Sequence, residues 1–145
     1  MKTPVVVVQA EGVRVALSRV RVATMVQAVL RGARVRSALL SVTFLSRRRM
    51  AGMNRRHLGH AGPTDVISFG FRDALGATIG DLYICPEVAA ANARVFGRPV
   101  REELARLVVH GTLHVLGYDH PTGEARMTSP MWRRQERYVR RWFPA

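Results

Sequence analysis

The segment HGTLHVLGYDH, residues 110–120, decides the fold expected for this sequence. His110 and His114 are four residues apart, so on a helix both imidazoles project from the same face, about one turn apart. Gly117 can take the left-handed conformation that ends a helix, and the chain can then turn back and bring His120 toward the same point. The spacing therefore predicts a helix that ends in a three-histidine metal site.

The three histidines suit a catalytic zinc ion. Three neutral imidazole nitrogens leave a fourth coordination position for water, which is typical of a catalytic zinc site rather than a closed structural one. The chain has five histidines, and three of them fall within these eleven residues. This spacing is more specific for a metal site than the positions of isolated histidines with structural roles. We therefore predict one zinc ion (Zn2+) per chain, bound by His110, His114 and His120.

The same segment tests one class of enzyme. In zinc peptidases with the H-E-x-x-H pattern, the residue after the first histidine is a glutamate that acts as general base. Here that residue is Gly111, whereas the remaining spacing, with Gly117 and His120, matches the extended H-E-x-x-H-x-x-G-x-x-H pattern. We therefore expect the metal-binding histidines of that class but not its general base. For this reason we rank peptide hydrolysis below other reactions.

The rest of the chain alternates between strand and helix patterns. The predicted strands are residues 4–8, 35–45, 66–71 and 81–85, and the predicted helices are residues 13–30, 46–57, 87–96, 101–116 and 124–142. This order predicts an α+β fold: a single domain over residues 1–145 with a small four-stranded mixed sheet and about five helices.

The composition indicates a folded protein without a membrane segment. Hydrophobic residues make up 48% of the chain and charged residues 23%. No apolar run approaches the roughly 20 residues that cross a bilayer, and the start of the chain is too short for a secretory signal. The single cysteine, Cys85, excludes an internal disulfide and is expected to be a buried small hydrophobe. We therefore expect a cytoplasmic protein.

The net charge of +13 favours a polyanionic partner. It arises from 22 arginines and one lysine against ten acidic residues. Basic groups that contact phosphates release counterions, which favours binding of RNA or DNA. The alternative is compositional, because a GC-rich coding background also replaces lysine by arginine.

Two arginine-rich segments are candidates for contact with nucleic acid. The first consists of Arg47, Arg48, Arg49, Arg55 and Arg56, which either bind RNA phosphates beside the metal or form a solvated helix face. In the second, near the C-terminus, arginines alternate with aromatic residues. These are Trp132, Tyr138 and Trp142, whose helical spacing favours packing over base stacking.

The histidine segment resembles the signature of the YbeY family of metal-dependent endoribonucleases. The resemblance continues through residues 63–69, 80–87 and 131–136, and it covers about residues 40–140. It implies a small mixed sheet with helices, and a metal ion at the end of one helix. The implied ligands are His110, His114 and His120.

The resemblance also implies an activity and a partner. It implies a cytoplasmic, metal-dependent endoribonuclease, a hydrolase that acts on phosphodiester bonds in single-stranded ribosomal RNA. The implied roles are processing of the 3′ end of 16S ribosomal RNA, and ribosome quality control at the small subunit. Two alternatives remain: a non-catalytic ribosome- or RNA-binding factor with a structural metal, and a metzincin-like zinc hydrolase.

One position departs from the family pattern. The family carries an arginine four residues after the asparagine that corresponds to Asn54, and this chain has Leu58 there. A cation at that position would neutralise the scissile phosphate as charge develops in the transition state. Leucine cannot do so, so either Arg55, Arg56 or His60 substitutes, or catalysis is weak, or the role has shifted toward binding.

Two aspartates have two possible roles each. Asp119 either accepts a hydrogen bond from a ligand imidazole or caps the turn after Gly117. Asp81 either orients a ligand or ends a strand.

Overall fold

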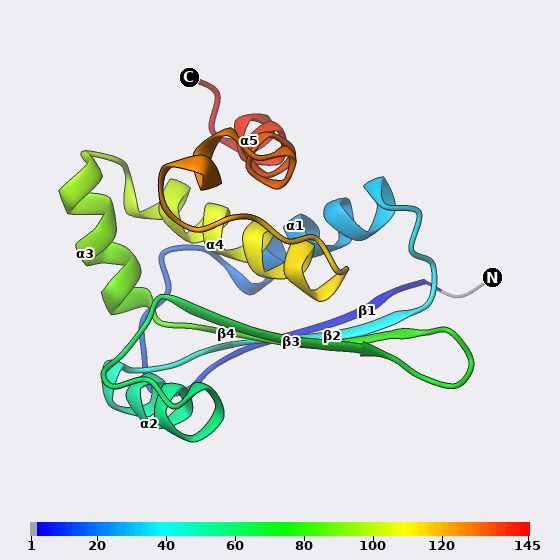
Figure 1. The fold of residues 1–145 in the computed structure, drawn as a ribbon, viewed down its shortest axis with the longest axis horizontal. Helices are drawn as coiled ribbons and strands as arrows, with labels where there is room; N and C mark the ends of the chain where they lie inside the picture. The colour runs from blue at the N-terminus through cyan, green and yellow to red at the C-terminus, as the bar shows by residue number, and fades with distance from the viewer. Residues whose placement is uncertain (1–2) are drawn as a thin grey trace.

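A four-stranded mixed sheet underlies the structure, a computed structural model that describes residues 3–145 (Figure 1). The strands are β1 (Val5–Ala10), β2 (Ala38–Phe44), β3 (Val66–Arg72) and β4 (Thr78–Ile84), in the order β1-β2-β4-β3. β1, β2 and β4 are parallel, and the edge strand β3 is antiparallel to β4. The predicted mixed sheet is therefore confirmed.

Five α-helices and one 3-10 helix complete the fold of residues 3–145. They are α1 (Arg19–Gly32), α2 (Arg47–Leu58), α3 (Pro86–Phe96), α4 (Val100–Val115), the 3-10 helix η1 (Gly123–Thr128) and α5 (Pro130–Trp142). Figure 1 shows α1, α4 and α5 on one side of the sheet and α2 on the other side. Within residues 3–145, no helix is both long enough and apolar enough to cross a membrane.

α4 is the central helix of the fold. It packs against β3, β4, α1, α3 and α5, and every residue from Glu103 to Leu113 is buried. Its apolar side chains Leu104, Val108 and Val109 belong to the core that joins the sheet to α1 and α5. Burial on this scale fixes the helix firmly, because each large apolar side chain contributes roughly 1.5–3 kcal/mol. The helix that was predicted to carry the metal is thus also the helix with the most extensive packing.

The limits of three predicted elements are wrong. The helix predicted from residue 13 begins at Arg19, because Ser18 caps it by accepting a hydrogen bond from the Arg21 N–H. The strand predicted for residues 81–85 is longer, since β4 already begins at Thr78. The helix predicted for residues 124–142 is divided into η1 and α5, because Ser129 caps a new helix whose first residue is Pro130.

Candidate metal centre

The end of α4 and the loop after it bring three imidazoles together. His110 and His114 lie on α4, and Gly117, with φ +95°, reverses the chain so that His120 meets them. The ring centroids are 4.6 Å (His110–His114), 5.0 Å (His114–His120) and 5.1 Å (His110–His120) apart. One nitrogen of each ring lies within 4.8 Å of one nitrogen of each other ring. The three histidines could therefore hold one metal ion, as the spacing predicts.

Backbone carbonyls orient the rings of His114 and His120. Nδ1 of His114 lies 3.0 Å from the carbonyl oxygen of Tyr118, and Nδ1 of His120 lies 2.9 Å from that of Pro121. A carbonyl oxygen only accepts hydrogen bonds, so each Nδ1 carries the proton and donates it. Each Nε2 is then an unprotonated nitrogen, the form that a metal ion requires.

A chain of side chains orients His110. Its Nδ1 donates to Oε1 of Gln135 at 2.7 Å, and Nε2 of Gln135 donates to Oε2 of Glu136 at 3.0 Å. Because Glu136 takes the amide N–H, the oxygen of Gln135 must face His110. Arg106 in turn donates to Glu136 from Nε at 2.8 Å and from Nη2 at 2.9 Å. The tautomer of His110 is thereby set by contacts between α4 and α5.

Burial favours the neutral form of His110 and His114. It lowers the pKa of His110 to about 4, and the charges of His114 and Arg126 act in the same direction against the hydrogen bond to Gln135. Burial also lowers the pKa of His114, with a further contribution from His120. Neutral imidazole is the form that binds metal, so these two residues are in their binding state at neutral pH.

Packing explains why no glutamate follows His110. Gly111 faces the sheet rather than the imidazoles, and a Cβ atom there would lie 2.8 Å from Cδ2 of Leu82 on β4. A larger residue at this position would require the buried Leu82 side chain to shift. The close packing of α4 on the sheet therefore favours glycine where the peptidases have their base.

The two aspartates have structural roles. Oδ1 of Asp119 accepts the backbone N–H of His120 at 2.8 Å, so Asp119 caps the turn. Asp81 lies within β4 and accepts a hydrogen bond from Ser41. Its neighbours Gly80 and Leu82 face α4, so Asp81 points to the opposite face of the sheet. Cys85 is buried as expected, and burial raises the pKa of its thiol.

The predicted RNA-binding arginines lie on α2, across the sheet from α4 (Figure 1). Arg47 pairs with Glu87 at 3.7 Å, and Arg49 pairs with Glu11 at 2.9 Å. The others form no ion pair within residues 3–145; these are Arg48, Arg55 and Arg56. Three of the five line a groove of about 660 Å3: Arg48, Arg49 and Arg56.

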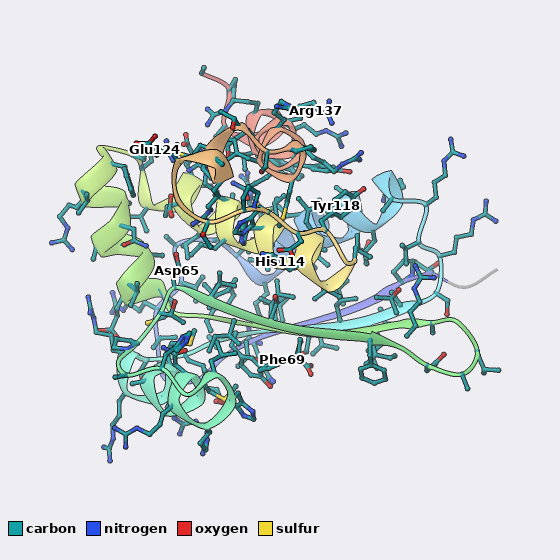
Figure 2. All side chains as sticks on the ribbon, viewed as in Figure 1. Asp65, Phe69, His114, Tyr118, Glu124 and Arg137 are labelled. Carbon is teal, nitrogen blue, oxygen red and sulfur yellow. The ribbon has the colours of Figure 1, made fainter. Side chains whose placement is uncertain are left out.

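Leu58 is the last residue of α2, with 47% of its surface exposed. Its neighbour His57 stacks edge-on against Phe69 of β3, with ring centroids 5.3 Å apart. Figure 2 shows Phe69 on the α2 side of the sheet and His114 on the α4 side. His57 and Phe69 therefore lie on the opposite side of the sheet from the three imidazoles, and the structure does not bring the two groups together.

Four residues around the histidines were not predicted from the sequence to belong to the site, and one of them, Trp132, was expected to pack. They are Asp65, Arg126, Trp132 and Gln135, which line a pocket next to His110. They come from three different segments of the chain (the loop before β3, η1 and α5), so no local spacing marks them as a group. Gln135 was noted only as part of the family resemblance over residues 131–136.

Comparisons with known proteins agree with this geometry. A model of the family described as endoribonuclease YbeY matches residues 8–142. Among curated proteins described as endoribonuclease YbeY, the Frankia alni protein is 37% identical over 120 residues, covering 74% of this chain and 65% of that protein. The Frankia casuarinae protein is 34% identical over 139 residues, covering 87% and 68%. The Salinispora tropica protein is 43% identical over 101 residues, covering 60% and 64%.

The match extends to three-dimensional structure. The solution structure of TM1509 from Thermotoga maritima aligns with a TM-score of 0.60 and 26% identity, over 93% of this chain and 87% of that chain. The chain spans slightly under two thirds of the length of two of the curated relatives, 65% and 64%. The match of the family model includes the whole histidine segment, the whole of β2, β3 and β4, and the end of β1 from Val8. This chain belongs to the YbeY family.

Proposed function

We propose that this protein is a metal-dependent endoribonuclease that cleaves single-stranded RNA, with one zinc ion held by Nε2 of His110, His114 and His120. The observation that carries the proposal is the convergence of three imidazoles whose Nδ1 atoms are all engaged by oxygen acceptors. Family membership supports the reaction class, and the net charge of +13 supports a nucleic-acid substrate.

The residues of the site have distinct tasks in this reaction. A zinc ion bound here would supply a Lewis acid and a water of lowered pKa. His110 is held rigidly by Gln135, whereas His114 and His120 are held by the backbone of the loop. With Gly111 in place of a glutamate, no carboxylate follows the first histidine to act as base. We propose that the α2 arginines, Arg55 and Arg56 among them, bind the RNA backbone away from the bond that is cleaved.

The cellular role proposed follows from the family. We propose that residues 1–145 act as one domain in the cytoplasm. The proposed substrate is ribosomal RNA of the small subunit, with cleavage near the 3′ end of 16S ribosomal RNA and a part in ribosome quality control. A second candidate, a ribosome-associated factor that binds RNA without cleaving it, is favoured by Leu58 at the family's arginine position.

The test is cleavage of a labelled single-stranded precursor of 16S ribosomal RNA, with and without a chelator, beside His114→Ala purified in the same way. We expect cleavage that disappears with the chelator and in the variant. Protein that carries its metal and sediments with small subunits, yet cleaves no more than His114→Ala, would overturn the nuclease proposal in favour of the binding factor.

A further inference from the structure

A pocket of about 390 Å3 opens directly beside the histidine site. We name it the Trp132 pocket. It lies between α3, α4, η1 and α5, and His110 forms part of its wall. Its other lining residues include Asp65, Phe96, Arg98, Arg126 and Trp132. Because His110 belongs to both, a molecule bound in the pocket would also border the metal site.

Trp132 differs from the other aromatic residues near the C-terminus. Tyr138 and Trp142 pack in the hydrophobic core, as the helical spacing predicts. Trp132 belongs to none of the three core clusters found in residues 3–145 and is only half-buried, at the pocket wall. An indole face that the core does not use is available for stacking with a flat ligand.

Two arginines place positive charge at the pocket wall, and Glu103, which also lines the pocket, is paired with Arg106. The guanidinium of Arg126 lies 5.9 Å from the ring centroid of Trp132, and that of Arg98 lies 5.6 Å from that of Phe96. Within residues 3–145, neither arginine forms an ion pair with a carboxylate. Arg126 and His110 line the same pocket. A phosphate held by Arg126 would therefore lie in the space that His110 borders.

The pocket also carries a fixed carboxylate. Oδ1 of Asp65 accepts the backbone N–H of Val66 at 2.8 Å, and Oδ2 accepts the side-chain amide of Asn92 at 3.3 Å. A carboxylate repels a simple anion but accepts hydrogen bonds from the N–H groups on the edge of a nucleobase. Aromatic faces, unpaired arginines and a hydrogen-bond acceptor are together the features with which proteins bind a nucleotide of single-stranded RNA.

We propose that the Trp132 pocket binds one nucleotide next to the scissile phosphate, with its base stacked on Trp132 and its phosphate at Arg126. This inference rests on the proposed function, because it takes single-stranded RNA as the ligand. Leu58 cannot make the contact with phosphate. The inference assigns that contact to Arg126, which lies across the sheet from α2.

The first experiment uses Trp132 itself as the reporter. The chain has two tryptophans, so Trp142→Phe leaves Trp132 as the only source of tryptophan fluorescence. The variant is titrated with a 2′-O-methyl hexanucleotide, which resists cleavage, in the presence of a chelator. Stacking of a base on the indole is expected to quench the fluorescence in a saturable way. Binding of the same oligonucleotide, measured by anisotropy of a label on it, without any quenching would overturn the proposal.

The second experiment measures affinity in the chain that keeps Trp142. Trp132→Leu is expected to weaken binding of the labelled hexanucleotide about 5- to 100-fold, because a base stacked on an aromatic residue contributes roughly 1–3 kcal/mol. Arg126→Gln is expected to weaken it about tenfold. The matched control is Arg94→Gln, an exposed arginine on α3 that does not line the pocket. Equal affinity of all three variants would contradict the proposal.

The two proposals fail in different ways. Chelator-sensitive RNA cleavage that is unaffected by Trp132→Leu would leave the nuclease in place and eliminate the nucleotide pocket. Quenching of Trp132 without cleavage by the metal-loaded protein would support the pocket and eliminate the nuclease. Thermal unfolding of Trp132→Leu, compared with that of Arg94→Gln, shows whether weaker binding comes from a lost RNA contact or from lost structure. If the unfolding transition is unchanged, the weaker binding is attributed to the pocket. If the transition is lost, the weaker binding does not support the pocket.

Discussion

The two sides of the histidine site are held by different means. On one side, which we call the anchored half, His110 is buried on α4 and is connected through Gln135 and Glu136 to Arg106. On the other side, the loop half, His120 lies after the chain reversal and is oriented by a backbone carbonyl. His114 lies between them: its Cα belongs to α4, but its ring is oriented by the loop.

The difference separates two tasks that a metal site must perform. The anchored half is built from side chains whose positions depend on the packing of α4 against α5, so it should be formed before metal binds. The loop half depends on local turns within residues 117–121, which cost little to rearrange. We infer that the anchored half would set the position of the site and that His120 of the loop half would complete the set of metal-binding residues.

The largest effect is expected from the ion network behind the anchored half. Arg106 contacts Glu102, Glu103 and Glu136 at 2.8–3.2 Å, and only 5% of its side chain is exposed. Arg106→Met leaves Glu103 without its partner, and Glu102 and Glu136 then retain only Arg140, so the free energy of unfolding should fall by about 3–5 kcal/mol. Urea denaturation measures this, with Arg101→Met, an exposed position on the same helix, as the control. A loss below about 1 kcal/mol would show that the network does not hold the two helices together.

The next effect separates the halves by metal affinity. Gln135→Leu removes the acceptor that orients His110, and outer-sphere partners of this kind affect metal affinity about 10- to 100-fold. Asp119→Ala removes only a cap within the loop, and we expect less than about a threefold change. Isothermal titration with zinc measures both. Equal losses would mean that the two halves are equally rigid.

A smaller effect is expected where the loop half begins. Gly117 has φ +95°, which an alanine adopts only with strain of about 1–2 kcal/mol. Gly59→Ala, at φ +69° at the end of α2, introduces similar strain far from His110, His114 and His120. Both variants should lose similar stability in urea, but only Gly117→Ala should bind zinc more weakly. If Gly117→Ala keeps full zinc affinity, the reversal does not position His120.

The smallest effect is a pH dependence of the anchored half. Burial opposes ionisation of Glu102 and Glu136, but hydrogen bonds from Arg106 outweigh it and lower the pKa of both. A carboxyl with a lowered pKa stabilises the fold above its unfolded pKa, near 4.3 for glutamate, and this contribution is lost as the pH falls through the folded value. Glu103 acts in the opposite sense, since burial raises its pKa and its ionised form is disfavoured.

Urea unfolding between pH 7 and pH 3 tests the sign of this pH dependence of stability. The free energy of unfolding should fall on acidification below about pH 4.3, and Glu136→Gln should be less stable than the parent at pH 7 with a flatter acid dependence. An acid dependence equally steep in Glu136→Gln would assign the loss to other carboxylates.

The features predicted correctly from the sequence are those with a local signature. The reversal at Gly117 and the four-residue spacing of His110 and His114 lie within one segment, and the structure brings the three imidazoles together as expected. The alternating apolar pattern around Leu40 and Val42 likewise predicted a strand over residues 35–45, and the structure has β2 there. Periodicity and turn residues are sufficient for such elements, because each depends on neighbours along the chain.

The features that escaped prediction depend on contacts between distant segments. Gln135 is 25 residues from His110, and Glu136 is 30 residues from Arg106. No spacing rule connects them, since their meeting depends on how α5 lies across α4. Trp132 was expected to pack like Tyr138 and Trp142, but it lies six and ten residues before them on α5, which sets it on a different face of the helix, at the pocket wall.

The most direct test of the account is the stoichiometry of zinc binding to the metal-free protein. Isothermal titration should show one ion bound per chain for the parent and for His60→Ala, an exposed histidine outside the site. His114→Ala should show no comparable binding while it unfolds at a similar urea concentration. Binding of one ion with parental affinity by folded His114→Ala would contradict the assignment of the three histidines as the metal site.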